Sequence, residues 1–140
     1  MLFYLTDKTL RNKRMIIGQG IDIVEIKRIG EAIERNAGSF LDRVYTPQEQ
    51  AEGKTRKRAA MAYYAGRWAA KEACAKALGC GIGENCSLTD ISVTQLQSGA
   101  PALELSGNAA EYLRKIGGKR VFVSISHEEN YAVAMVTIEQ

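Results

Sequence analysis

Two carboxylates in apolar surroundings are the residues of this sequence best placed to do chemistry. Asp22 interrupts the apolar run Ile16–Val24, and Glu72 lies in the alanine-rich stretch Gly66–Gly79, with Lys76 four residues later. Two hard oxygen ligands suit Mg²⁺, which fills its remaining positions with water and substrate phosphate. A nearby lysine would stabilise the remaining phosphate charge. The pattern therefore predicts phosphoryl or pyrophosphate chemistry without a covalent enzyme intermediate.

The same residues also have plain structural interpretations. Glu72 and Lys76 could form an i,i+4 ion pair on a helix, and Asp22 could end a strand and cap the next helix. His127 could be a turn residue that bonds to its neighbours. A buried carboxylate without a partner is costly. The metal interpretation therefore depends on whether the fold brings Asp22 and Glu72 together.

The element that must position Glu72 and Lys76 is a long helix predicted from about Arg58 to Leu78. Alanine recurs along it, proline is absent, and a glycine follows as a C-terminal stop. At 100° per residue, Glu72 and Lys76 share a side with apolar positions, namely Met61, Ala65, Trp68 and Ala69. Arg67 and Lys71 fall on a different side, so we expect Glu72 and Lys76, rather than Lys71, on the side that is buried.

The other elements follow from period and turn signals. Before the long helix we expect a strand at Ile16–Val24, a helix at Glu25–Asn36, a helical turn at Ser39–Tyr45 and a short helix opened by the capping box Thr46-Pro47-Gln48-Glu49. After it we expect strands at Ile91–Leu96 and Ala102–Leu105, a helix at Ser106–Ile116, and strands at Arg120–Ile125 and Tyr131–Ile138 joined by a turn containing Ser126 and His127.

The order β-α-α-α-β-β-α-β-β predicts an α+β fold, with a mostly antiparallel sheet packed against the long central helix. The alanine-rich circumference of that helix indicates close neighbours on more than one side, as in an oligomer.

Composition narrows the class of protein. At 140 residues, 46% hydrophobic and 25% charged, the chain has the size and composition of one globular domain. The formal net charge of +3 equals that of residues 1–14, which we expect to be a leader or tail with little function, followed by a single domain at 15–140. The remainder has 15 basic and 15 acidic residues, which argues against a protein that coats nucleic acid.

The sequence also indicates the cellular compartment of the protein. No apolar run reaches the length of a membrane span, and no secretory signal is recognisable, so the cytoplasm is the expected location. The three cysteines, Cys74, Cys80 and Cys86, form no C-x-x-C pair. With a single histidine they predict reduced thiols rather than a zinc site.

Four sequence blocks carry a resemblance to a known family. In order they are Gly18-x-Gly20-Ile21-Asp22-Ile23-Val24, Phe40-x-x-Arg43-Val44-x-Thr46-x-x-Glu49, Arg67-Trp68-Ala69-Ala70-Lys71-Glu72-Ala73-x-x-Lys76-Ala77-Leu78-Gly79 and Ser124-Ile125-Ser126-His127-Glu128. From Met15 onward the sequence resembles the holo-[acyl-carrier-protein] synthases, the small bacterial class of 4′-phosphopantetheinyl transferases.

The resemblance implies that fold and a reaction of fatty acid biosynthesis. The 4′-phosphopantetheine arm of coenzyme A passes to a serine of apo-acyl carrier protein, and adenosine 3′,5′-bisphosphate is released. By position, Asp22 and Glu72 would bind Mg²⁺, and Lys76 would bind the pyrophosphate. Glu72 and Lys76 would be the catalytic pair, with the group that removes the serine proton left open and Glu72 a candidate.

The resemblance also implies binding sites and an assembly. Arg67, Ser126 and His127 would bind coenzyme A together with Lys76, and Arg28 would meet the acidic carrier protein. The family is typically a homotrimer with active sites between subunits, and it involves neither nucleic acid nor a membrane. Two alternatives stay open: a non-catalytic module that binds through the basic run Lys54–Arg58, and another metal-dependent phosphotransferase or hydrolase of nucleotides.

Overall fold

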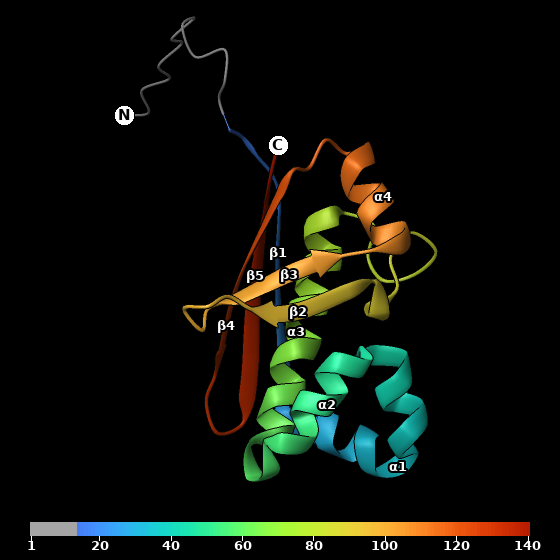
Figure 1. The fold of residues 1–140 in the computed structure, drawn as a ribbon, viewed down its shortest axis with the longest axis vertical. Coiled ribbons are helices and arrows are strands. Elements are labelled where there is room, and N and C mark those ends of the chain that lie inside the picture. The colour runs from blue at the N-terminus through green and yellow to red at the C-terminus, as the bar shows by residue number, and fades with distance from the viewer. Residues whose placement is uncertain (1–13) are drawn as a thin grey trace, which may run out of the picture.

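A long helix forms the centre of the fold, and the other elements pack around it (Figure 1). The computed structural model describes residues 14–140. In chain order the elements are β1 (Ile16–Glu25), α1 (Ile26–Val44), α2 (Pro47–Thr55), the 3₁₀ turn η1 (Lys57–Ala59), α3 (Ala60–Leu78), the 3₁₀ turn η2 (Leu88–Asp90), β2 (Ile91–Gln95), β3 (Pro101–Leu105), α4 (Gly107–Lys115), β4 (Arg120–His127) and β5 (Tyr131–Glu139). Apart from the two short turns, this order is the predicted one.

The strands form two antiparallel sheets on different sides of α3. One sheet has the order β1-β5-β4, and β2 pairs with β3 as a separate hairpin. Figure 1 shows the hairpin crossing in front of α3 while the three-stranded sheet lies on its other side. This arrangement confirms the α+β class and the antiparallel pairing.

The alanine-rich surface of α3 is explained by the chain itself. Residues on every side of the helix are buried, including Tyr64, Ala69, Ala73 and Ala77. The sheet packs on one side, and α1, α2 and the β2–β3 hairpin pack on the others. Because these neighbours belong to the same chain, the alanine content alone does not require an oligomer.

Two predicted boundaries differ from the structure. The predicted helix at Glu25–Asn36 and the turn at Ser39–Tyr45 are joined in α1, which leaves helical geometry only at Asn36 (φ −138°, ψ 34°). Ser126 and His127 were expected in a turn, but they are the last two residues of β4. Both pair with β5, opposite Val133 and Ala132, so the strand continues beyond its apolar part.

The capping box is confirmed, and its glutamate has a second role. Glu49 Oε1 accepts a hydrogen bond from Thr46 N, while Thr46 Oγ1 accepts one from Glu49 N. The carboxylate is 1% exposed and also lies 2.6 Å from Lys71 Nζ on α3. Its other oxygen accepts from Val93 N of β2 at 2.8 Å. One carboxylate therefore joins α2, α3 and β2.

The prediction that Lys71 lies away from the buried side of α3 is wrong. Lys71 is 0% exposed, and besides Glu49 it donates to Val44 O at 2.8 Å and Leu88 O at 3.1 Å. Burial lowers the pKa of Lys71, and Glu49 opposes that shift. A buried ammonium is tolerable here because all of its donors have partners. The helical wheel misplaced it because α3 is apolar around its whole circumference and has no single buried side.

Glycines let β1 lie directly on α3. A Cβ at Gly20 would overlap Ala73 O and would lie 2.9 Å from Lys76 Cβ, and a Cβ at Gly18 would overlap Ala77 O. Gly18, Gly20 and Asp22 share one face of β1 because side chains alternate along a strand. The absence of side chains at 18 and 20 therefore brings Asp22 close to the residues of α3.

We expect Gly20→Ala to destabilise the fold by about 3 kcal/mol or more, the upper range for overpacking, because the obstructing atoms are helix backbone and cannot move aside. Urea unfolding measures the change. Gly83→Ala is the matched control, since a Cβ there meets nothing within 4 Å, and it should shift the free energy of unfolding by less than about 0.5 kcal/mol. Equal stability of the two variants would refute the close packing of β1 on α3.

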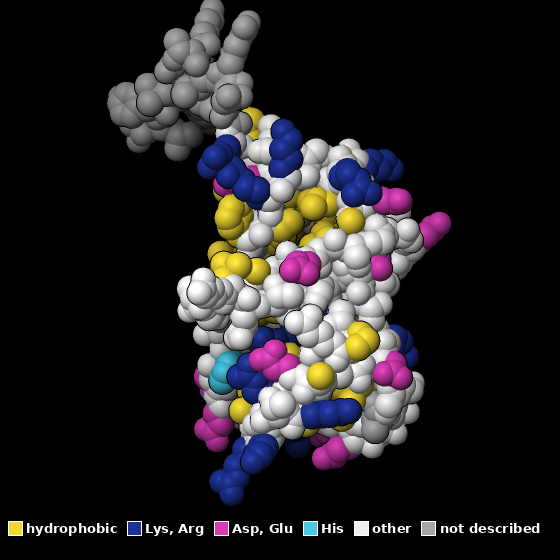
Figure 2. Space-filling model, viewed as in Figure 1, with side chains coloured by type: hydrophobic (Ala, Val, Ile, Leu, Met, Phe, Trp, Pro, Cys, Tyr) yellow, Lys and Arg dark blue, Asp and Glu magenta, His cyan; other side chains and the backbone are white. Residues whose placement is uncertain are grey.

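Basic side chains gather at one end of the molecule. Figure 2 shows Lys and Arg side chains gathered at the end of the molecule where the C-terminus lies. Arg14, Lys119 and Arg120 belong to this end, because the last two flank the start of β4 and pair with Glu139, and Arg14 precedes β1. Within residues 14–140, no helix combines the length and apolar character that a bilayer crossing needs. Residues 1–13 of the predicted leader lie outside the described part.

Candidate active site

Asp22 and Lys76 meet where β1 crosses the last turns of α3. Lys76 Nζ lies 3.0 Å from Asp22 Oδ1 and donates to the backbone oxygen of Ile21 at 2.9 Å. The Asp22 side chain is 16% exposed, whereas that of Lys76 is 52% exposed. The lysine therefore bonds to the strand while reaching solvent, where an anionic ligand could approach it.

The second oxygen of Asp22 has no partner. Asp22 Oδ2 is buried and accepts no hydrogen bond. A buried carboxylate oxygen without a donor or a cation is costly, so its retention calls for an explanation. A positively charged ligand bound at this oxygen would remove the cost.

Glu72 lies next to the same carboxylate. Burial raises the pKa of Glu72, and the negative charge of Asp22 raises it further, while Lys76 and Arg28 lower it. Glu72 lies one helical turn before Lys76 on α3, and Lys76 contacts Asp22, so the two acidic residues that the sequence places 50 positions apart belong to the same crossing of β1 and α3. Lys76 pairs with Asp22 across the strand, so the alternative of a simple Glu72–Lys76 helix pair does not describe its contacts.

These groups fit a hard divalent cation. Two partly buried carboxylates lie at this crossing, where Lys76 contacts Asp22 one turn beyond Glu72, and Asp22 Oδ2 lacks a donor. Within residues 14–140, no three His, Cys, Asp or Glu side chains gather as a metal site. Mg²⁺ is commonly bound by one or two carboxylates, with waters and substrate phosphate completing its shell. Zinc and calcium sites usually take more protein ligands.

Arg67 lies nearer the N-terminus of α3 and is held by an aromatic ring. Its guanidinium carbon lies 4.0 Å from the centre of the Tyr63 ring, and Arg56 lies over the same ring at 5.1 Å. Arg67 Nε is buried and has no hydrogen-bond partner. The ring thus orients a cation that retains a free donor, which suits recognition of phosphate or carboxylate.

Ser126 and His127 are exposed at the end of β4 and line a hollow of 270 Å³ together with Ile23, Tyr131 and Val133. No hydrogen bond or ion pair in residues 14–140 joins either of them to Arg67, Glu72 or Lys76. Within one copy of the chain, Lys76 is bonded to Asp22, whereas no bond links Ser126 or His127 to these residues.

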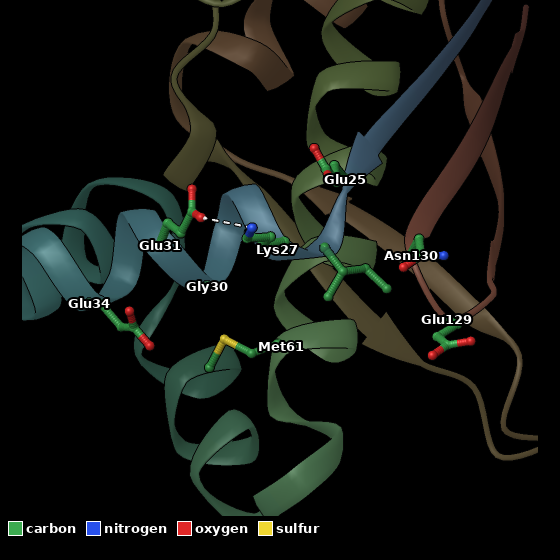
Figure 3. Close-up of a pocket in the computed structure, with 9 residues that line it drawn as sticks. Glu25, Lys27, Gly30, Glu31, Glu34, Met61, Glu129 and Asn130 are labelled. Carbon is green, nitrogen blue, oxygen red and sulfur yellow. Dashed lines mark ion pairs between the residues drawn. The ribbon is translucent and has the colours of Figure 1, made fainter.

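A second hollow, of 480 Å³, lies between α1, the start of α3 and the β4–β5 turn (Figure 3). It is lined by Glu25, Glu31, Glu34 and Glu129. Its lysine, Lys27, lies 3.8 Å from Glu31, as the dashed line in Figure 3 marks. None of the predicted site residues lines this hollow, and its carboxylates would repel an anionic ligand such as a diphosphate.

Sequence reasoning missed the residues that make the site possible. Gly18 and Gly20 were interpreted only as part of the family motif, although their spacing puts them in phase with Asp22. Two glycines at i and i+2, followed by an acid at i+4, indicate a strand face pressed against another backbone. The buried ion pair between Lys71 and Glu49 has no comparable sequence pattern, because it joins side chains from two separate helices.

Comparisons with known proteins identify the family and the fold. Residues 18–136 match the family model of the 4′-phosphopantetheinyl transferase superfamily. A holo-[acyl-carrier-protein] synthase of Mesorhizobium japonicum is 45% identical over 129 residues, which cover 89% of this chain and 93% of the relative. That of Koribacter versatilis is 42% identical over 125 residues, covering 89% of this chain and 99% of the relative.

Solved structures give the same result. The crystal structure of holo-[acyl-carrier-protein] synthase from Neisseria meningitidis matches with a TM-score of 0.83 and 36% identity, over 90% of this chain and 100% of that one. The enzyme from Helicobacter pylori, solved in complex with coenzyme A, matches with a TM-score of 0.76 and 36% identity, over 86% and 98% of the two chains.

Proposed function

This chain belongs to the holo-[acyl-carrier-protein] synthase family of the 4′-phosphopantetheinyl transferase superfamily, and from that membership we propose the reaction and the roles of its residues. It is an enzyme that uses coenzyme A to modify an acyl carrier protein. In the proposed reaction, a serine hydroxyl of the apo-carrier attacks the phosphorus that bears pantetheine. The phosphopantetheine arm is transferred, and adenosine 3′,5′-bisphosphate leaves. The contact of Lys76 with Asp22, whose second oxygen is buried without a partner, is the observation that carries this proposal.

Asp22 and Glu72 would hold Mg²⁺. The bound ion would offset the charge of the coenzyme A diphosphate and make its phosphorus more electrophilic. Lys76, half exposed beside Asp22, would bind a diphosphate oxygen and stabilise the charge that grows on the leaving phosphate. Arg67, with its unpartnered Nε, would bind another phosphate of coenzyme A.

Ser126 and His127 would contact coenzyme A from a site completed by a neighbouring copy. The outer face of the three-stranded sheet offers a surface for assembly. Five of its exposed side chains are apolar: Ile21 (60% exposed), Ile23 (65%), Phe122 (50%), Tyr131 (48%) and Met135 (47%). Strand pairing places them as neighbours on one face, as Ile21 lies opposite Met135. We propose a homotrimer with active sites between its subunits.

We expect Ile23→Asp to convert the assembly to monomers, because a carboxylate would be desolvated at the centre of the apolar face. Size-exclusion chromatography with light scattering measures the mass, which should fall about threefold. Ile82→Asp is the matched control, since Ile82 is 39% exposed in the loop after α3 and lies off the sheet. A wild-type chain that elutes as a monomer would refute the trimer.

Arg28 would provide the contact with the carrier protein. It is exposed in the first turn of α1, and its charge reaches Glu72. An acidic carrier bound at Arg28 would thus bring its serine close to the metal site. We further propose that residues 15–140 act as one transferase domain, and that the protein works in the cytoplasm, a reducing compartment in which free cysteines are common.

The proposed function is tested by mixing the protein with Mg²⁺, coenzyme A and apo-acyl carrier protein. Mass spectrometry of the carrier should show a gain of roughly 340 Da, the mass of a phosphopantetheine arm, and none without Mg²⁺. An unmodified carrier would refute the proposal. Release of free phosphopantetheine without any carrier would instead indicate a hydrolase.

A further inference from the structure

All three cysteines of the chain gather at the C-terminal end of α3. Cys74 lies in the helix and Cys86 follows the next loop, and both are 0% exposed. Cys80 is partly exposed and packs against the same core cluster. The three thiols are free. Cys80 is therefore the thiol at which a dissolved oxidant can arrive.

The loop between Cys80 and Cys86 is folded back on the helix end. The amides of Gly79 and Gly81 both donate to Ala75 O at 3.2 Å. Further along, Gly83 and Cys86 exchange backbone hydrogen bonds of 2.9 and 3.3 Å, which close the turn before Cys86. Cys80 and Cys86 are thus both held against the last turn of α3.

Cys80 packs against the core cluster that contains Cys86, and the backbone bonds of the loop hold both residues at the same end of α3. Burial raises the pKa of Cys86 to about 12, and the neighbouring Cys80 thiol contributes to this shift both by its charge and through a side-chain hydrogen bond. Burial raises the pKa of Cys74 to about 12 as well, with smaller contributions from Cys86 and Cys80.

We propose that Cys80 and Cys86 are a reversible oxidation site, with Cys80 as the reacting thiol and Cys86 as the resolving one. The co-reactant is a peroxide. The Cys80 sulfur attacks one peroxide oxygen, the O–O bond breaks, and a sulfenic acid and one water form when the peroxide is hydrogen peroxide. The Cys86 sulfur then attacks the Cys80 sulfur, its proton passes to the departing hydroxyl, and a second water leaves. Two thiols are oxidised to a disulfide, and one peroxide is reduced to two waters.

The disulfide would act on the site described above. Gly79 N donates to Lys76 O at 3.0 Å and to Ala75 O, so the cysteine loop caps the turn that carries Lys76. A disulfide would fix the Cβ atoms of Cys80 and Cys86 about 3.8 Å apart and so would constrain Cys80, the residue next to this cap. Oxidation would therefore displace Lys76 and slow phosphopantetheine transfer. This last step rests on the proposed function, whereas disulfide formation does not.

Intact-mass spectrometry of the reduced protein before and after hydrogen peroxide tests the pair without any substrate. Wild type should lose about 2 Da per chain, peptide mapping should join Cys80 to Cys86, and dithiothreitol should reverse the change. Cys86→Ala should stop at a sulfenic acid on Cys80 that dimedone traps, and Cys80→Ser should not react. Cys74→Ala is the control and should still form the disulfide. An unchanged wild-type mass, or a link through Cys74, would overturn the pair.

The transfer rate of the same samples tests the consequence. Oxidised wild type should be at least fivefold slower than reduced wild type, and dithiothreitol should restore the rate. Cys80→Ser should keep its rate in peroxide. A disulfide that leaves the rate unchanged would overturn the link to Lys76. If the reduced protein transfers nothing, the proposed function fails, while the mass result still decides the cysteine pair.

Discussion

Asp22→Asn is expected to reduce phosphopantetheine transfer by about 10³-fold while leaving the fold intact, a loss comparable to removing one charged stabiliser of a transition state. Asparagine has nearly the same size as aspartate, so the contact of β1 with α3 is preserved. The change removes one of two acidic ligands and the negative partner of Lys76, which lies 3.0 Å away. We expect Glu72→Ala to abolish transfer for the same reason. Carrier-protein mass gain with time measures both rates.

The control for Asp22→Asn is Glu104→Gln, which neutralises an exposed carboxylate on β3, outside the residues that approach Glu72. Its rate should stay within about twofold of wild type. Thermal melting of each variant separates a lost site from a lost fold. An Asp22→Asn protein that keeps more than about a tenth of the wild-type rate would contradict the assigned metal ligands.

Lys71→Ala is expected to destabilise the protein by about 3–5 kcal/mol, the usual cost of removing one partner from a buried ion pair. The substitution leaves Glu49 charged and 1% exposed, and it leaves the carbonyls of Val44 and Leu88 without their donor. It also opens a cavity beside α3. Urea unfolding measures the loss, which represents a large share of the stability of a domain of this size.

Two further variants make the interpretation of Lys71→Ala specific. Lys27→Ala breaks an exposed pair with Glu31, whose lysine side chain is 77% exposed, and should cost less than about 0.5 kcal/mol. Lys71→Met with Glu49→Gln removes both charges and should recover part of the loss, since glutamine can still accept from Val93 N. A double variant as unstable as Lys71→Ala would show that lost packing, rather than an unpaired charge, causes the effect.

Much of the fold could be predicted because its signals are local. The capping box at Thr46 marked the start of α2, the glycine after Leu78 marked the end of α3, and alternation marked the strands. The ends of the strands were predicted less accurately. Ser126 and His127 are polar, so the sequence favoured a turn, but pairing with β5 extends β4 through both of them.

Features that depend on contacts between distant parts of the chain could not be predicted from such local signals. A helical wheel assigns a buried side only when one side is apolar, and α3 is covered by the chain on several sides, so Lys71 was misplaced. The approach of Asp22 to Glu72 depends on how β1 lies across α3. Gly18 and Gly20 set that distance through contacts with helix backbone. The family resemblance supplied the pairing of the two acids that spacing alone left open.

The most direct test of the account is a crystal structure of the protein with Mn²⁺ and coenzyme A, in which anomalous scattering locates the ion independently of its ligands. The account predicts a single strong peak bonded to Asp22 Oδ2 and to the Glu72 carboxylate, with a diphosphate oxygen of coenzyme A on the same ion. A peak elsewhere, or coenzyme A bound while Asp22 Oδ2 still lacks a partner, would contradict it.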